Sequence, residues 1–288
     1  MMLISKAKKT LWLGTHFILL LTVLSNGELR ASSVAEECEK ASASNAFAAC
    51  DRAIQADPLN ATAFFKRGEA LLVRGDVDRA ISDLTRAISI NSKWGAPFIL
   101  RGNAWSSKQD ARAIEDYRAA INLNPKSSAN YNLALIYHEG FIVKKDYKKA
   151  IELYLVSAND GVVEAQHNLG LLYSEENSEF KNYKFAAAWF RKAAELGYME
   201  AQVELASLYL SGLGANVDVA EAEKWFLIAF QKGSPYAAYN LGLLYSGDFD
   251  KKFRNLDKAI SFFKFAVDKH IAEAQQALEK ALREKASR

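Results

Sequence analysis

The sequence contains few of the residues that interrupt helices or build redox sites. It has four prolines, fifteen glycines and two cysteines among 288 residues. So little proline and glycine predicts short connections between regular elements. Half of the residues are apolar and a quarter are charged, a composition that excludes a disordered tail and a collagen-like fibre.

The sequence also lacks an excess of positive charge beyond its first residues. Three of the 37 basic residues and none of the 34 acidic residues lie within residues 1–27, so the rest of the chain carries equal numbers of both. Proteins that bind nucleic-acid phosphates usually show a clear basic excess. The charge balance therefore predicts no nucleic-acid partner.

Catalytic and cofactor-binding motifs are missing as well. The sequence has no G-x-S-x-G, H-E-x-x-H or P-loop pattern. The histidines beyond residue 27 are His138, His167 and His270, and none has the close spacing typical of metal ligands. We therefore predict a protein that is not an enzyme and that holds neither a metal nor a cofactor.

Residues 1–27 have the pattern of a secretory signal peptide. A basic head precedes a mostly apolar run from Leu11 to Leu24, and the small residues Ser25 and Gly27 precede a cleavage point after Gly27. A helix of about 14 residues spans about 21 Å, less than the roughly 30 Å hydrocarbon core of a bilayer. We expect a periplasmic or secreted protein with no stable membrane insertion after cleavage; an uncleaved N-terminal anchor is the alternative.

The two cysteines, Cys38 and Cys50, lie twelve residues apart. In an exported chain an isolated pair predicts a disulfide, and this spacing suits a bridge between two short antiparallel helices. Loop-closure entropy makes such a bridge worth roughly 3 kcal/mol. The alternative is a pair of unbonded buried thiols.

The second half of the chain repeats with a period of 36 residues. The repeated positions are Ala129, Ala165, Ala201 and Ala237; Leu133, Leu169, Leu205 and Leu241; and Tyr137, Tyr173, Tyr209 and Tyr245. Later in each unit, apolar residues recur at spacings of three and four, as on one face of a helix. Each unit therefore predicts two helices and a turn. Gly161, Gly197 and Gly233 fall where the second helix ends, and His270 takes the corresponding place in the last unit.

Upstream the period shortens. Arg67-Gly68 and Arg101-Gly102 are 34 residues apart, and Ala80 and Leu84 in one unit match Ala113 and Tyr117 in the next. On these residues, the segment 61–126 resembles two tetratricopeptide repeats. The segment 28–60, which keeps Ala46, Cys50, Ala53 and Pro58, resembles a degenerate repeat of the same kind.

Residues 127–270 resemble four Sel1-like repeats. The clearest match runs from Ala201 to Gly233 and includes Leu205, Tyr209, Gly212 and Ala222. The resemblance implies an all-α fold, an α-solenoid in which antiparallel helix pairs stack into a superhelix, and it is closest to an exported bacterial type. Residues 271–288 carry one apolar stripe and predict a C-terminal helix that caps the stack.

The resemblance also implies a binding surface, because in tetratricopeptide repeats the first helix of each pair lines the concave face. Two columns of that face map onto this chain: Phe65, Ile99, Tyr131, His167, Val203 and Tyr239, and beside them Asn132, Asn168, Glu204 and Asn240. An asparagine amide offers two donors and an acceptor, which suits an extended peptide backbone. The alternative is that the recurring asparagines cap helices, bridge adjacent repeats or reflect a packing habit of the whole family.

These observations predict a non-enzymatic protein–protein interaction scaffold or regulator that binds a protein or peptide segment. One alternative is a binder or hydrolase of envelope polysaccharide or peptidoglycan, for which Glu164, Glu200 and Glu204 are the acidic candidates. Another is a structural spacer without a fixed ligand.

Overall fold

The computed structural model describes residues 32–42, 45–176 and 178–287. The signal peptide predicted for residues 1–27, with its cleavage point, lies outside these ranges. Every regular element within them is a helix, so the predicted all-α solenoid of antiparallel helix pairs is confirmed. In the same ranges, none of the helices combines the length and the apolar composition that a membrane span requires.

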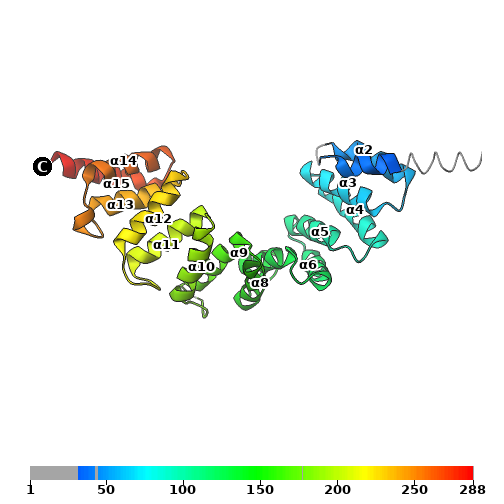
Figure 1. The fold of residues 1–288 in the computed structure, drawn as a ribbon, viewed down its shortest axis with the longest axis horizontal. Coiled ribbons are helices and arrows are strands. Elements are labelled where there is room, and N and C mark those ends of the chain that lie inside the picture. The colour runs from blue at the N-terminus through cyan, green and yellow to red at the C-terminus, as the bar shows by residue number, and fades with distance from the viewer. Residues whose placement is uncertain (1–31, 43–44, 177, 288) are drawn as a thin grey trace, which may run out of the picture. The chain divides into compact units, whose positions relative to one another are not determined.

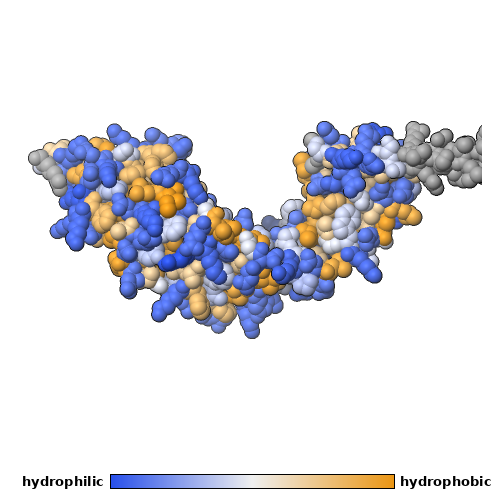
Figure 2. All heavy atoms as spheres, viewed as in Figure 1, coloured by the Kyte–Doolittle hydropathy of each residue, from blue (hydrophilic) through white to orange (hydrophobic). Residues whose placement is uncertain are grey.

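The chain divides into two compact units, and the division passes through helix α7. Of the described residues, those up to 133 and those of 141–143 form the first unit, and those of 134–140 and from 144 onward form the second. Within the first unit the successive helices between residues 46 and 123 pack against one another, and within the second unit so do those between residues 147 and 286 (Figure 1). Figure 2 shows a mostly hydrophilic surface with scattered hydrophobic residues on this face of each unit.

The first unit begins with helical residues 32–40. It continues with α2 (Ala46–Ala56), α3 (Ala61–Val73), α4 (Val77–Ile90), α5 (Gly95–Ser107), α6 (Arg112–Leu123) and the start of α7 (Ala129–Glu139). Helices α3 and α4 form one antiparallel pair, and α5 and α6 form the next.

The described part of the second unit contains the end of α7, the helix α8, three complete helix pairs and one final helix. Its helices are α8 (Tyr147–Asn159), α9 (Val163–Ser174), α10 (Tyr183–Glu195), α11 (Met199–Ser211), α12 (Val219–Gln231), α13 (Pro235–Ser246), the short 3₁₀ turn η1 (Lys251–Phe253), α14 (Leu256–Asp268) and α15 (Ala272–Ala286). Helix α15 packs against α14, where a capping helix was predicted.

The second helix of each pair in the second unit begins at a polar side chain that accepts backbone N–H groups. Asp146 accepts from Lys149 N at 3.0 Å, and Asp218 accepts from Glu221 N at 2.9 Å. Asn182 and Asn255 do the same at the starts of α10 and α14. These oxygens satisfy donors that the first turn of a helix leaves unpaired, so the acids are structural, as predicted for Asp146 and Asp218.

The turns after the second helices need a left-handed residue. Gly161, Gly197 and Gly233 have φ angles of 90°, 89° and 91°. His270 stands at the equivalent place with φ 63°. Glycine adopts this conformation without the penalty that a Cβ brings, which explains the 36-residue recurrence. His270 is therefore a turn residue rather than part of a site.

Small residues on the first helices let aromatic rings of the second helices approach closely. A Cβ added at Gly170 would lie 2.4 Å from the Phe190 ring, and one added at Gly242 would lie 2.4 Å from the Phe263 ring. Both phenylalanines are almost completely buried. Together with Phe226, which is fully buried, they form the centre of the apolar core of the second unit.

A half-buried arginine joins three successive helices of the first unit. Arg67 on α3 donates from Nε and Nη2 to the two carboxylate oxygens of Asp83 on α4, at 2.7 and 2.8 Å. Its Nη1 donates to Asp51 on α2. The hydrogen bonds to Asp83 raise the pKa of the Arg67 guanidinium above its usual value, so the charge is permanent.

The same arrangement recurs one repeat later. Arg101 on α5 donates from Nε and Nη2 to Asp116 on α6 at 2.8 and 2.7 Å, and from Nη1 to Thr85 on α4 at 2.9 Å. Asp116 is buried, with 4% of its surface exposed. The repeated Arg-Gly pair of the sequence therefore marks a link between repeats. The glycine has no side chain to obstruct the neighbouring helix, and the arginine forms hydrogen bonds with side chains on two other helices.

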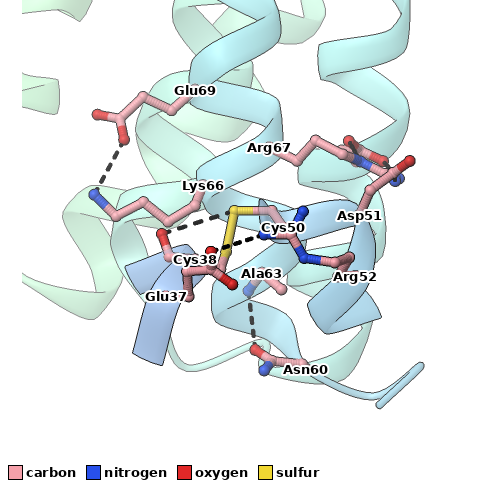
Figure 3. Close-up of a disulfide and its surroundings, with 11 residues drawn as sticks. Glu37, Cys38, Cys50, Asp51, Arg52, Asn60, Ala63, Lys66, Arg67 and Glu69 are labelled. Atoms are coloured by element: carbon pink, nitrogen blue, oxygen red, sulfur yellow. Dashed lines mark hydrogen bonds and ion pairs between the residues drawn. A yellow bond between two sulfur atoms is a disulfide. The ribbon is translucent and has the colours of Figure 1, made fainter. Parts of the chain in front are cut away.

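The disulfide predicted between Cys38 and Cys50 is present. It joins the helical segment 32–40 to α2, and both cysteines are buried among small apolar side chains of α2 and α3 (Figure 3). Arg52 and Glu37 form an ion pair of 2.8 Å across the same two helices. The bridge thus holds a short terminal helix against the solenoid.

Removing this bridge is expected to destabilise the start of the first unit. In a Cys38→Ala/Cys50→Ala variant, the free energy of unfolding should fall by roughly 3 kcal/mol, because the unfolded chain regains the freedom of the closed loop. Hydrogen exchange of α2 and α3 amides measures the loss, and the α14 amides of the same sample provide the control. Unchanged exchange in α2 would contradict a stabilising role.

Candidate functional site

Three first helices of the second unit together build a groove. It has a volume of about 500 Å³ and is bordered by α9, α11 and the start of α13. Its lining residues are His167, Leu171, Met199, Glu200, Val203, Glu204, Ser207, Ser234, Pro235, Tyr236 and Asn240. A volume of this size is within the range of ligand sites in proteins. We call this hollow the α9–α11–α13 groove.

Four of the ten predicted groove residues meet here. His167, Val203, Glu204 and Asn240 line the same hollow although they come from three different helices. Tyr239, the residue that the 36-residue spacing aligns with Val203, packs against Phe263 with ring centroids 6.1 Å apart.

The predicted groove residues of the first unit lie on α3, α5 and α7. Phe65 packs against Trp94, with ring centroids 4.5 Å apart, and is half-buried. Ile99 and Tyr131 are also half-buried. These side chains are therefore partly used in packing between neighbouring helices.

The recurring asparagines already make hydrogen bonds within the chain. Asn132 Nδ2 donates to Asn103 Oδ1 at 2.8 Å, and Asn168 Nδ2 donates to the Tyr154 hydroxyl at 3.2 Å. Asn240 Nδ2 donates to the Tyr236 carbonyl one turn back in its own helix, at 3.0 Å. Asn132 and Asn168 thus link neighbouring helices, whereas Asn240 makes its bond inside α13 and lines the groove.

Aromatic packing holds His167 in place at the groove. Its ring lies 5.7 Å from the Phe190 ring and 5.0 Å from the Tyr198 ring, measured between centroids. Burial lowers the pKa of His167 below its usual value, because the charged form loses hydration. His167 is therefore neutral at pH 7 and offers the groove a polar, uncharged ring.

Comparison with known proteins identifies the repeats. Family models match residues 127–162, 163–198, 200–234 and 235–270 as Sel1 repeats, and residues 43–93 as a tetratricopeptide repeat. The chain is a tetratricopeptide and Sel1 repeat protein. The family resemblance predicted from the 34- and 36-residue periods is thus confirmed. No curated protein matches the sequence.

Solved structures share the fold. The Sel1 repeat protein from Oxalobacter formigenes is 24% identical with a TM-score of 0.62, over 75% of this chain and 86% of that one. A protective antigen of uropathogenic Escherichia coli strains, with an SLR fold, is 21% identical with a TM-score of 0.62, over 86% of this chain and 58% of that one. The structure of pilF from Pseudomonas aeruginosa is 19% identical with a TM-score of 0.59, over 79% of this chain and 98% of that one. At these identities the likeness shows the fold alone.

The third Sel1 repeat supplies the charge of the groove. Glu200 and Glu204 lie one turn apart on α11, Glu200 exposed and Glu204 half-buried. Burial raises the pKa of the Glu204 carboxyl above its usual value. Glu204 makes no hydrogen bond or ion pair within the described ranges. It is therefore a partly desolvated carboxylate without a counter-charge.

Sequence reasoning missed several lining residues of the Sel1 repeats. Leu171 and Ser207 lie one helical turn after His167 and Val203, and Tyr236 lies one turn before Asn240. The helical spacing of four could have extended each predicted position to these neighbours. Ser234 and Pro235 had no such signal, because they are the N-cap and the first residue of α13 and lie before the positions that the repeat spacing singled out.

The groove carries no sign of metal chemistry. In the part of the chain that the structure describes, no group of three or more His, Cys, Asp or Glu side chains is arranged to hold a metal ion. The groove offers apolar area, a neutral histidine, two carboxylates and an amide. These groups can bind a ligand by burial, hydrogen bonding and charge.

Replacing Glu204 with glutamine is expected to stabilise the Sel1 repeats at neutral pH. Because the folded state raises the Glu204 pKa, the wild-type chain loses stability as pH rises through that pKa, and glutamine removes this loss. Below the ordinary carboxyl pKa of 4.5 the group is neutral in both states, so the difference should vanish. Urea unfolding midpoints at pH 4 and pH 7 measure it. A lower midpoint for the variant at pH 7 would mean that Glu204 has a stabilising partner.

Proposed function

We propose that this repeat protein is an exported, non-enzymatic scaffold or regulator that binds a segment of a protein partner in the α9–α11–α13 groove. The observation that carries the proposal is the groove itself, since three successive first helices together form one hollow of about 500 Å³. The repeat fold, which generally serves protein–protein interaction, supports it. Recognition rather than catalysis is the proposed activity.

The groove suits binding because it is already formed in the free protein. Its helices are held by a core in which Leu205, Phe226 and Leu241 are almost fully buried. Association loses less free energy when one side needs no ordering, so a rigid groove can gain affinity from several weak contacts. The exposed ring of Tyr236, with 62% of its surface accessible, offers apolar area at the rim.

A photo-cross-linking experiment tests the groove. Benzoylphenylalanine is placed at Val203 in the groove, and at Phe185, an exposed aromatic residue on α10, as the matched control. Irradiation of intact cells should give discrete adducts with other proteins from the Val203 variant and not from the Phe185 variant. The same adducts from both positions, or none from Val203, would contradict binding in the groove.

Export is proposed from the pattern of residues 1–27 and from the disulfide. A thiol-labelling experiment in a bacterial host tests it: the full chain should leave Cys38 and Cys50 unreactive toward maleimide under denaturing conditions. A chain without residues 1–27, retained in the reducing cytoplasm, should have both thiols reactive. Reactive thiols in the full chain would contradict export to an oxidising compartment.

A further inference from the structure

The charged side chains that line the α9–α11–α13 groove are all negative. Its lining contains the carboxylates of Glu200 and Glu204 and, among the described residues, neither lysine nor arginine. His167 does not balance them, because burial lowers its pKa and keeps it neutral at pH 7. The free protein therefore presents two negative charges at a hollow whose other walls are largely apolar.

Of the two carboxylates, Glu204 says more about which ligand charge the groove favours. It is half-buried on α11 and makes no ion pair or hydrogen bond within the described ranges. A carboxylate that has lost part of its hydration without gaining a partner is unfavourable in the free protein. A ligand that brings a positive charge to it gains more than the same ligand would gain at a fully hydrated carboxylate.

Other ligand charges fit less well. A C-terminal carboxylate or a phosphate would meet Glu200 and Glu204 with like charge and find no basic side chain in the lining. A neutral ligand that fills the groove would strip further water from Glu204 without neutralising it. A basic side chain avoids both problems, because its ammonium or guanidinium group can pair with the carboxylate.

The apolar walls fit the rest of such a side chain. Leu171, Met199, Val203 and Tyr236 line the groove near the two acids. Lysine and arginine bury their methylene stems along apolar surface while their charged ends seek a polar partner. The lining can also hold an apolar side chain that neighbours the basic one, since the hollow is larger than one side chain requires.

We propose that the α9–α11–α13 groove selects a peptide segment that presents a lysine or arginine beside an apolar residue. Glu204 is the principal counter-charge and Glu200 adds negative charge one turn away. This specificity rests on the proposed function, that the groove binds a protein segment.

The proposal is tested with a displayed library of random 12-residue peptides, selected on the protein lacking residues 1–27 with its disulfide formed. Peptides that bind should be enriched in lysine or arginine next to an apolar residue. One enriched peptide is then synthesised with its basic residue and with norleucine in its place. Fluorescence anisotropy measures the affinity of both peptides for each protein variant.

Two protein variants and the norleucine peptide give the comparison. Glu204→Gln should lower the affinity for the basic peptide by about 10- to 100-fold, because one charge-assisted contact is lost. Glu152→Gln removes the same charge from an exposed position on α8 and should leave the affinity unchanged. The norleucine peptide should bind Glu204→Gln at least as tightly as the wild type, because it cannot neutralise the Glu204 carboxylate. Circular dichroism confirms that each variant is folded.

The outcomes separate the two proposals. If peptides bind but show no basic enrichment, or bind Glu204→Gln as tightly as wild type, the basic specificity is wrong and the groove proposal stands. A Val203→Arg variant places a bulky cation in the groove and should abolish binding. If the selected peptides bind Val203→Arg unchanged, or if no peptide is selected, binding in the groove is itself wrong.

Discussion

Replacing Phe226 with alanine is expected to lower the free energy of unfolding of the second unit by about 3–5 kcal/mol. Phe226 on α12 is fully buried at the centre of a core formed by the second, third and fourth Sel1 repeats. The variant loses the burial of the ring and leaves a cavity that packed helices on both sides cannot close. Urea unfolding followed by circular dichroism measures the change.

Phe185 provides the matched control for this prediction. It is also a phenylalanine on a second helix, α10, but 54% of its surface is exposed and it contacts Tyr173 at its edge. Phe185→Ala should cost less than about 1 kcal/mol, because most of the ring remains in water in the folded state. Equal losses for the two variants would contradict the placement of Phe226 in the core.

Replacing Arg101 with alanine is expected to destabilise the first unit by about 3–5 kcal/mol. The change leaves Asp116 buried without the two hydrogen bonds of 2.8 and 2.7 Å that it receives from Arg101. Arg101→Lys should recover only part of the loss, because an ammonium group cannot donate to Asp116 in the bidentate way and also reach Thr85.

Arg79 on α4 is the control for Arg101. It pairs with Asp76 at 3.4 Å, and 62% of its side chain is exposed. Removing an exposed ion pair of this kind changes stability by at most about 1 kcal/mol. Urea unfolding of Arg101→Ala and Arg79→Ala measures both. If Arg101→Ala is no more destabilising than Arg79→Ala, the link across α4, α5 and α6 does not stabilise the unit.

The helix pairs were predictable because their signal is local and repeated. Gly161, Gly197 and Gly233 mark turns that need a positive φ, and Asp146 and Asp218 stand where a helix start needs an acceptor. Each of these residues acts within a few positions of itself. Repetition at a fixed period then makes the same local requirement visible several times over.

The arginine links were not predicted, although their residues repeat as well. In the sequence, Arg67-Gly68 and Arg101-Gly102 show only that the pair recurs after 34 residues. Their partners lie 15 or 16 positions away on other helices, so the pairing depends on how the helices are rotated against each other. Periodicity shows which face of a helix is apolar but not which two polar side chains meet.

The candidate site also has a part that the repeat spacing predicts and a part that it does not. The residues that line the first helices could be named from the repeat spacing, and four of them meet in one groove. The spacing also aligned Tyr239 with Val203, yet Tyr239 packs on Phe263, and it is Asn240 that lines the groove. Side chains at equivalent positions diverge because each repeat packs against neighbours with different side chains.

The amino-acid sequence by itself determined the helical repeat architecture and the disulfide, because turn conformations, helix starts and a single cysteine pair are dictated by residues close together in the chain. Only the tertiary structure decided which side chains face each other across helices. It left Glu204 half-buried without a partner in a groove and enclosed Arg101 against Asp116. Burial and pairing depend on the positions of several helices at once, and no spacing within one helix contains that information.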